Sequence, residues 1–164
     1  MNNKINIREC TEKDCSLLLN FIKELAKYEN MLDQVTATEE ILKNNLFNKN
    51  IAKAIIAEYN GNPCGYALYF YNFSTWHGKP GIYLEDLFVK PEYRGYGIGK
   101  ALFTYVAKIA YENNFARFEW VCLDWNAPSI KFYKSMGAKA MDEWTTYRLD
   151  GDNLKNTGNI YPNL

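Results

Sequence analysis

Apolar and polar positions follow two distinct periods along this chain, and the changes of period predict the order of its elements. Residues 4–9 alternate isoleucine with polar neighbours, which is typical of a short, half-buried strand. Residues 11–29 carry apolar side chains at every third or fourth position, after a Thr-x-x-Asp start that nearly forms a capping box, so they predict an amphipathic helix. A second helix is expected to begin at Thr36 or Thr38.

Near-continuous apolar runs follow in the middle of the chain. Residues 53–59 and 64–73 predict two strands, and the Asn60-Gly61 pair between them favours a tight antiparallel hairpin. Because apolar and polar residues hardly alternate in these runs, we expect both faces of the strands to be buried. An aromatic-rich loop at 74–80 leads to a further strand at 81–89.

The helical period then returns twice. Residues 98–113 predict a long helix, and residues 117–123 predict another strand. Asn126 or Asp124 is placed to cap a shorter helix, which Gly137 is expected to end.

The C-terminal residues predict two last strands, at about 139–141 and 144–149. The tail from residue 150 onward is expected to be mobile or to depend on a partner. A length of 164 residues fits one domain, so we expect a single domain at 1–150 and a tail at 151–164.

A glycine-rich turn between the strand at 81–89 and the following helix is the clearest candidate binding site. Gly95, Gly97 and Gly99 leave backbone N–H groups bare at the start of a helix, where the helix dipole favours an anion, and Arg94 adds a positive charge. A phosphate or pyrophosphate is therefore expected here. The alternative is a glycine-rich helix start that serves only a tight turn.

Two common phosphate loops do not fit this turn. A Walker loop requires Ser or Thr after Gly-Lys, but Ala101 follows Lys100, and its first glycine would fall at Arg94. A dinucleotide fingerprint requires G-x-G-x-x-G, whereas the glycines here are evenly spaced. What remains is an R-x-x-G-x-G loop.

Two acids interrupt the apolar strand just before that loop. Glu85 and Asp86 are adjacent, and successive strand residues point to opposite faces, so one carboxylate should meet a helix-covered face unless a bulge or a wet cleft receives it. Such acids favour a functional site, and the alternative is a structural carboxylate bound to a loop. His77 is interpreted as a loop residue, because no orienting carboxylate lies near it in sequence.

Composition excludes several classes of protein. Nineteen basic and nineteen acidic residues give a net charge of zero, so no global field favours nucleic acid or an anionic membrane. The start lacks an apolar signal region and no apolar run is long enough to span a bilayer, which predicts a cytoplasmic protein with no membrane partner. Four cysteines that form no C-x-x-C motif and one histidine offer no plausible zinc set, so we expect metal-free chemistry.

Several separated strings, in this order, resemble one known family. They are L-A-K-Y-E at 25–29, D-Q-V at 33–35, Y-L-E-D at 83–86, Y-R-G-Y-G-I-G at 93–99, D-W-N at 124–126 and F-Y-K at 132–134. Together with the element order β-α-α-β-β-β-α-β-α-β-β, they resemble the GNAT superfamily of acetyl-CoA-dependent N-acetyltransferases. The resemblance covers residues 4–149 and points to the diamine (spermidine/spermine) and thialysine acetyltransferase branch.

The resemblance implies an α/β (α+β) fold with a mixed central sheet of about seven strands, split after the fourth strand and flanked by helices on both faces. It also implies a homodimer. The positions that correspond to acetyl-CoA contacts are Leu87, Phe88, Val89, Arg94, Gly95, Tyr96, Gly97, Ile98, Gly99, Lys100, Asn126, Ser129 and Tyr133. Those that border the amine site are Tyr28, Glu29, Trp76, Glu85, Asp86, Glu119 and Trp120.

The same resemblance assigns two catalytic roles. Glu85 corresponds to the base that removes a proton from the amine, and Tyr133 to the acid that protonates the departing thiolate. A phenol of pKa about 10 facing a thiol of about 8.5 can lend a proton as charge builds on sulfur. The alternative for Tyr133 is a helix tyrosine that only packs.

The expected activity is acetyl transfer to the primary amine of a small cationic acceptor, such as a polyamine, a diamine or a lysine analogue. Asp33 and Asp124 stand where the family often has glutamate, so the length of the acceptor stays open. Two alternatives stay open as well. The acceptor could be a protein or peptide amine, or the chain could be a non-catalytic acyl-CoA-binding module.

Overall fold

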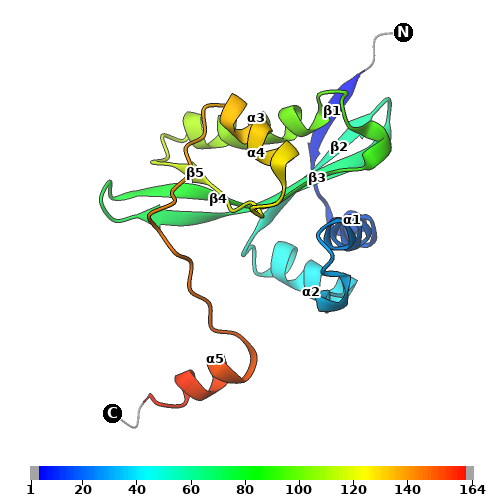
Figure 1. The fold of residues 1–164 in the computed structure, drawn as a ribbon. Coiled ribbons are helices and arrows are strands. Elements are labelled where there is room, and N and C mark those ends of the chain that lie inside the picture. The colour runs from blue at the N-terminus through cyan, green and yellow to red at the C-terminus, as the bar shows by residue number, and fades with distance from the viewer. Residues whose placement is uncertain (1–3, 162–164) are drawn as a thin grey trace. The chain divides into compact units, whose positions relative to one another are not determined.

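One mixed sheet organises the computed structural model of this protein, which describes residues 4–161 (Figure 1). The sheet order is β1-β2-β3-β4-β5, in which the first four strands pair antiparallel and β5 pairs parallel to β4. The strands are β1 (Ile5–Glu9), β2 (Lys53–Tyr59), β3 (Asn62–Ser74), β4 (Lys79–Val89) and β5 (Phe118–Glu119). The chain divides into two compact units, Met1–Val121, which holds the sheet, and Cys122–Leu164.

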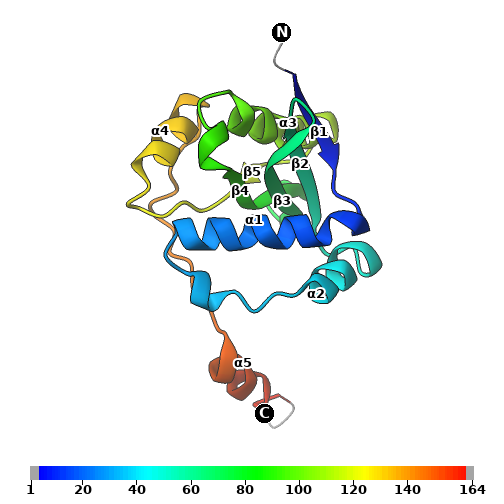
Figure 2. The same ribbon diagram turned by 90° about the vertical axis from the view of Figure 1, so that its right-hand side faces the viewer.

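Helices cover both faces of the sheet in the N-terminal unit. α1 (Cys15–Tyr28) and α2 (Glu39–Lys43) lie on one face, and α3 (Ile98–Glu112) lies on the other (Figure 2). Short 3₁₀ turns at Glu12–Asp14, Leu32–Gln34 and Pro91–Tyr93 and a π-helical turn at Asn44–Asn48 join these elements. The expected mixed α/β class with helices on both faces is confirmed.

Local signals set the ends of the helices as expected. The Thr11 backbone N–H donates to the Asp14 carboxylate at 2.8 Å, which starts the turn that leads into α1. Asn30 has φ of 59°, a left-handed conformation that ends α1. The Thr38 hydroxyl accepts a hydrogen bond from the Ile41 N–H at 3.2 Å, so the second of the two proposed threonine caps is the one used.

The hairpin between β2 and β3 turns at the predicted Asn-Gly pair. Asn60 and Gly61 have φ of 51° and 81°, and Tyr59 pairs with Asn62 across the turn. Two consecutive positive φ values are the signature of a type I′ turn, which matches the twist of the flanking strands. The interior of both strands is buried, as the continuous apolar runs predicted.

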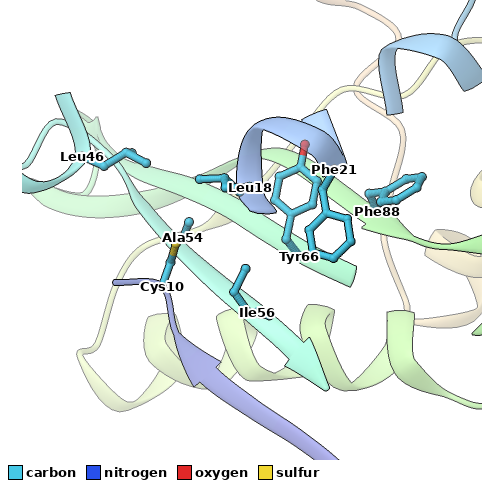
Figure 3. Packing of buried hydrophobic residues seen from close by; sticks show 8 residues of the cluster. All are labelled: Cys10, Leu18, Phe21, Leu46, Ala54, Ile56, Tyr66 and Phe88. Carbon is cyan, nitrogen blue, oxygen red and sulfur yellow. The ribbon is translucent and has the colours of Figure 1, made fainter. Parts of the chain in front are cut away.

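Aromatic packing fills the space between α1 and the sheet. Phe21 of α1 stacks on Tyr66 of β3 with ring centroids 5.8 Å apart and an angle of 2° between the planes (Figure 3). Phe88 of β4 packs against the same two rings at about the same separation, 6.1 Å from Phe21 and 6.3 Å from Tyr66. Phe21 and Tyr66 are completely buried. The core thus fixes α1 against β3 and β4, where the acids of β4 lie.

The sheet opens after β4, as expected, but has five strands in the described residues instead of about seven. β5 pairs with β4 only at Ile82 and Tyr83, and covers two residues of the predicted strand at 117–123. Residues 139–141 and 144–149, predicted as strands, form none. Their β pattern favours extended backbone, but a strand also needs a neighbouring chain to receive its hydrogen bonds.

The C-terminal unit has two helices among its described residues, α4 (Ala127–Ser135) and α5 (Gly151–Gly158). Gly137 has φ of 86° just beyond the end of α4, as predicted. α5 lies in the tail, where no element was predicted, because this short and strongly polar segment gives only a weak helical signal. No helix in the described part of the chain combines the length and apolarity that crossing a bilayer requires.

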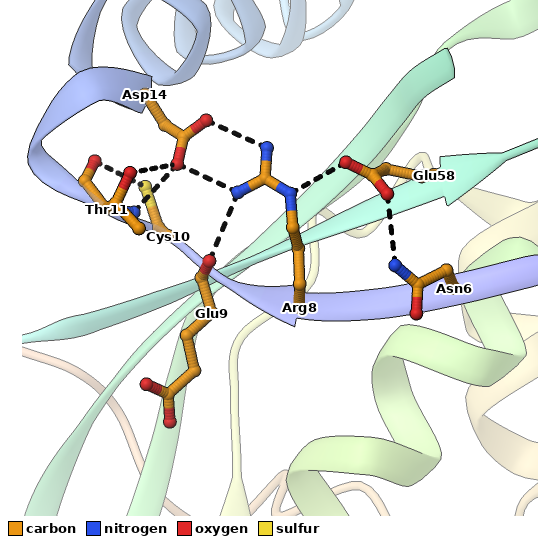
Figure 4. A network of polar contacts seen from close by, with 7 residues as sticks. All are labelled: Asn6, Arg8, Glu9, Cys10, Thr11, Asp14 and Glu58. Carbon is orange, nitrogen blue, oxygen red and sulfur yellow. Dashed lines mark hydrogen bonds and ion pairs between the residues drawn. The ribbon is translucent and has the colours of Figure 1, made fainter. Parts of the chain in front are cut away.

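A charge network ties the start of the chain to β2. Arg8 donates to the Asp14 carboxylate through both terminal nitrogens at 2.8 Å, and to Glu58 through Nε at 2.7 Å (Figure 4). The hydrogen bond from Arg8 is the main cause that lowers the pKa of Asp14 well below its usual range, and it lowers the pKa of Glu58 in the same way. Bidentate pairing in a partly buried place makes this network stronger than an isolated surface ion pair.

Replacing Arg8 by Met should therefore lower the free energy of unfolding by about 2 kcal/mol at pH 7, because two carboxylates lose their hydrogen-bond donor. Carboxylates with lowered folded-state pKa values stabilise the protein above the pKa of the unfolded chain, about 4, and lose that contribution as the pH falls through the folded value. The difference between Arg8→Met and the wild type should thus shrink below pH 4, which denaturant unfolding at several pH values will measure.

The matched control is Lys43→Met, which removes another ion pair from the same unit. Lys43 and Glu12 lie 2.9 Å apart, but both side chains are about half exposed. This change should cost well under about 1 kcal/mol. An equal loss in both variants would contradict the strength assigned to the Arg8 network.

Candidate active site

A β-bulge in β4 shapes the candidate site. Leu68 of β3 pairs with Asp86 and the next residue, Tyr69, pairs with Leu84, so Glu85 is the extra residue and has no partner in the register. The bulge leaves Glu85 exposed, while Asp86 is partly buried. A bulge thus receives Glu85, while Asp86 lies on the face of the sheet that α1 covers.

Asp86 forms a hydrogen bond with a buried tyrosine of the neighbouring strand. The Tyr66 hydroxyl donates to Asp86 Oδ2 at 2.8 Å. Burial is the main cause that raises the pKa of Asp86 to about 6; the Tyr66 hydrogen bond opposes this rise, and the negative charges of Glu85 and Glu29 add to it. The pKa of Asp86 therefore lies well above the usual range of an aspartate.

The end of α1 supplies a third acid. Glu29 follows the last residue of α1, and partial burial raises its pKa. Because its charge acts on both Asp86 and Tyr66, it belongs to the same electrostatic environment. Glu29, Glu85 and Asp86 are named the acidic cluster from here on. The negative charges of Glu85 and Glu29 disfavour the ionised form of Asp86, and a cation beside the three carboxylates would offset this repulsion.

The predicted glycine loop follows directly from β4. Gly95 and Gly97 have φ of 84° and 83°, a region that other residues rarely adopt, so the two glycines are needed for the path of the loop. The first i→i−4 bond of α3 runs from the Ala101 N–H to the Gly97 carbonyl at 2.9 Å. The amides of residues 98–100 therefore precede the helical ladder and are the anion-binding groups of a helix start.

Arg94 has a second use that the sequence did not reveal. Its Nε donates to the Val89 carbonyl at 3.0 Å, and its guanidinium lies 4.9 Å from the centre of the Tyr28 ring. The side chain thereby ties the glycine loop to the end of both β4 and α1. Tyr96 of the same loop packs on Tyr59, with ring centroids 5.2 Å apart, while Lys100 is exposed.

The last residues of β4 lie between the acidic cluster and the loop. Phe88 packs in the core with Tyr66, while Leu87 and Val89 point to the opposite face. β3 pairs with one edge of this segment, and β5 reaches only Ile82 and Tyr83 on the other edge. That second edge can hydrogen-bond an extended chain that carries amide groups.

Three predicted acceptor residues lie in other surroundings. Trp76 is 87% exposed in the turn between β3 and β4. This turn lies before Lys79, the first residue of β4, and Lys79 is itself six residues from Glu85, or roughly 20 Å along the strand. Glu119 accepts from Asn72 at 2.6 Å and pairs with Arg117 at 3.1 Å. Trp120 packs against Phe103 and Phe118, each at 5.0 Å between ring centroids. Of the predicted acceptor residues, the structure gathers Tyr28, Glu29, Glu85 and Asp86.

The remaining predicted site residues lie in the C-terminal unit. The Asn126 side chain caps α4 by accepting a hydrogen bond from the Ser129 N–H at 3.4 Å. Of the two proposed caps, Asn126 and Asp124, Asn126 is therefore the one used. Tyr133 lies two turns further along α4, and its ring centroid is 5.4 Å from that of Phe132.

Tyr66 is the residue of this site that the sequence analysis missed. A tyrosine inside a doubly buried strand needs a hydrogen-bond partner for its hydroxyl, and this need was the available signal. The partner could not be known, because Asp86 becomes its diagonal neighbour only through the pairing of β3 with β4.

The raised pKa of Asp86 predicts a gain in stability when the charge is removed. A carboxyl whose folded-state pKa lies above its unfolded value contributes stability below about pH 4 that is lost as the pH rises through 6. Asp86→Asn should therefore stabilise the protein by about 1 to 2 kcal/mol at pH 8 and by little at pH 4. Thermal unfolding at both pH values measures this, with the exposed Glu92→Gln as control. A loss of stability at pH 8 would contradict the assignment.

Comparison with known proteins identifies the family. Residues 18–138 match the acetyltransferase (GNAT) family. The chain is 40% identical over 161 residues to a thialysine N-epsilon-acetyltransferase of Sus scrofa, covering 91% of this chain and 94% of that protein. It is 31% identical over 159 residues to a human spermidine/spermine N(1)-acetyltransferase-like protein 1, covering 90% of this chain and 23% of that protein.

A solved structure has the same fold. An integron cassette protein from the mobile metagenome of V. cholerae superposes with a TM-score of 0.79 and 30% identity, covering 94% of this chain and 97% of that one. The match to the family spans β2 to β5, the bulge, the glycine loop and α4. Members of this family use acetyl-CoA. The chain therefore belongs to the acetyltransferase (GNAT) family, and the expectation of an acetyl-transferring enzyme is confirmed.

Proposed function

We propose that this acetyltransferase moves the acetyl group of acetyl-CoA to the primary amine of a small cationic acceptor, such as a polyamine, a diamine or a lysine analogue. The acidic cluster at the bulge of β4 is the observation that carries this proposal, because its carboxylates favour a positively charged molecule. The names of the similar thialysine and spermidine/spermine enzymes support the same class of acceptor.

The glycine loop and the open edge of β4 fit acetyl-CoA. The amides of residues 98–100 suit a pyrophosphate, and extended backbone at residues 87–89 suits the amides of the pantetheine arm. The proposed contacts are those expected from the sequence, namely Leu87, Phe88, Val89, Arg94, Gly95, Tyr96, Gly97, Ile98, Gly99, Lys100, Asn126, Ser129 and Tyr133. When bound, acetyl-CoA supplies the acetyl thioester.

Proton removal is the first task of the enzyme. An amine with a pKa near 10.4 is neutral in only about one molecule in 2,500 at pH 7, so its nitrogen can attack only after it loses a proton. Glu85, exposed at the bulge, takes that proton through a water molecule. Asp86 and Glu29 hold the positive charge of the acceptor nearby, while Tyr28 borders the site.

Acyl transfer then needs two further groups. The Leu87 N–H polarises the thioester carbonyl and stabilises the negative charge that develops on its oxygen. As the new C–N bond forms and the C–S bond breaks, Tyr133 gives its hydroxyl proton to the departing sulfur. Trp76, Glu119 and Trp120 stay proposed as acceptor contacts only by family resemblance, since Glu119 and Trp120 already have structural partners.

The resemblance also carries three proposals about the whole protein. We propose that residues 1–150 act as a single acetyltransferase domain with a tail at 151–164, of which 162–164 lie outside the described residues. We further propose that the enzyme is a homodimer and that it is cytoplasmic.

An acceptor panel tests the function. Purified protein with acetyl-CoA should release CoA in the presence of polyamines, diamines or lysine analogues, and less with peptides that bear an N-terminal or lysine amine. Mono-acetylated forms of the best acceptor serve as matched controls, because losing one positive charge should raise KM about tenfold. Turnover with peptides alone would favour the protein-acceptor alternative. Tight CoA binding without turnover would favour a non-catalytic module.

The role of Tyr133 has its own test. Tyr133→Phe removes only the hydroxyl and should lower kcat by about 100-fold or more, because general acid catalysis is lost, while the Kd for CoA stays within a few-fold of the wild type. Tyr111→Phe is the control, since Tyr111 is 85% exposed on α3. An unchanged kcat in Tyr133→Phe would remove this residue from the mechanism.

A further inference from the structure

A phenol inside the core is aimed at the acidic cluster. Tyr66 is completely buried, and its ring packs against both Phe21 and Phe88. Figure 3 shows the ring stacked on Phe21. Packing alone would be satisfied by a phenylalanine at this place, because the hydroxyl adds no apolar contact. The hydroxyl instead donates to Asp86 Oδ2 at 2.8 Å.

We propose that Tyr66 is a positioning residue, which orients Asp86 toward the positive charge of the acceptor and keeps this carboxylate ionised for binding. This inference rests on the proposed transfer to a cationic amine, and it adds a residue that acts only through Asp86. Since the Tyr66 ring cannot move without disturbing the core, the hydrogen bond fixes one carboxylate oxygen and leaves the other for the acceptor.

The charges around Asp86 explain why such a donor matters. Glu85 on its own strand and Glu29 at the end of α1 both disfavour the ionised form, and so does burial. The two cations that follow β4 are engaged with aromatic rings, since Lys90 lies 5.6 Å from the centre of Phe21 and Arg94 lies 4.9 Å from that of Tyr28.

Among the residues described, Asp86 forms no ion pair with a lysine or arginine. The Tyr66 hydrogen bond is therefore the interaction within the protein that favours the carboxylate of Asp86. A positively charged acceptor would supply the missing counter-charge when it binds.

A pH profile separates this role from a purely structural one. In Tyr66→Phe the ring is retained and only the hydrogen bond is lost, so the acidic limb of kcat/KM for the best acceptor should move up by about one pH unit. Near pH 6 the KM for the acceptor should rise about fivefold, while kcat at saturating acceptor and pH 8.5 should stay within about twofold of the wild type.

The matched control is Tyr69→Phe. Tyr69 lies on the same strand and is 4% exposed, but it pairs with Leu84 and faces the opposite side of the sheet. This variant loses a buried hydroxyl without touching Asp86, so its pH profile should match that of the wild type. An equal shift in both variants would overturn the proposal, because it would reflect a general effect on the core.

A readout without acceptor completes the test. The 13C signal of the Asp86 carboxyl is identified by its absence in Asp86→Asn. It should titrate at a higher pH in Tyr66→Phe than in the wild-type protein. If this midpoint moves and the kinetic limb does not, Asp86 does not bind the acceptor and the proposal fails. It fails as well if neither moves. If the wild type acetylates no amine, the proposed function fails first, and this is visible before any variant is compared.

A double variant guards against a folding defect in Tyr66→Phe. If Tyr66 acts through Asp86, adding Tyr66→Phe to Asp86→Asn should change KM by less than about twofold beyond Asp86→Asn alone. An additive loss in the double variant would show that Tyr66 acts independently of Asp86, and would overturn the proposal.

Discussion

One extra residue in β4 is the constraint on which the site depends. Because Glu85 has no partner on β3, the strand changes the face that its side chains meet at that point. Leu84 and Leu87 lie on one side of the sheet, whereas Asp86 and Phe88 lie on the other, beneath α1. Without the bulge, a regular alternation would exchange the faces of every residue on one side of it. The acids, the core and the start of the glycine loop are therefore placed by the same irregularity.

Two groups of charged residues in the N-terminal unit differ in how their surroundings act on the ionised carboxylates. In the Arg8 network, two carboxylates share a guanidinium, and their ionised forms are stabilised. In the acidic cluster, Glu85 and Glu29 disfavour the ionised form of Asp86, and the Tyr66 hydroxyl is the hydrogen-bond donor to Asp86 among the described residues. The first arrangement stabilises the fold. The second costs stability at neutral pH, as is common for groups placed for binding, and the proposed cationic acceptor would offset that cost.

The conformation of the glycine loop was predicted from the sequence, but the contacts of its arginine were not. Its glycines adopt the left-handed backbone that their spacing indicated, and the helix start follows at once. Arg94 was expected beside the bare amides as a cation for the anion. In the structure it also holds the Val89 carbonyl and the Tyr28 ring. Loop, strand end and helix end are thus connected by one side chain, a link that no spacing in the sequence could reveal.

The sequence by itself determined the local elements of this protein, because their causes are local. The Thr38 cap, the Asn60-Gly61 turn, the positive φ glycines and the apolar period of α1 each depend on residues a few positions apart. Strand pairing is a long-range property, and this is why the predicted strands at 139–141 and 144–149 are not formed. For the same reason, only the tertiary structure decided that Tyr66 meets Asp86 and that Glu119 binds Asn72. Residues far apart in sequence acquire partners through register and packing, which single positions do not encode.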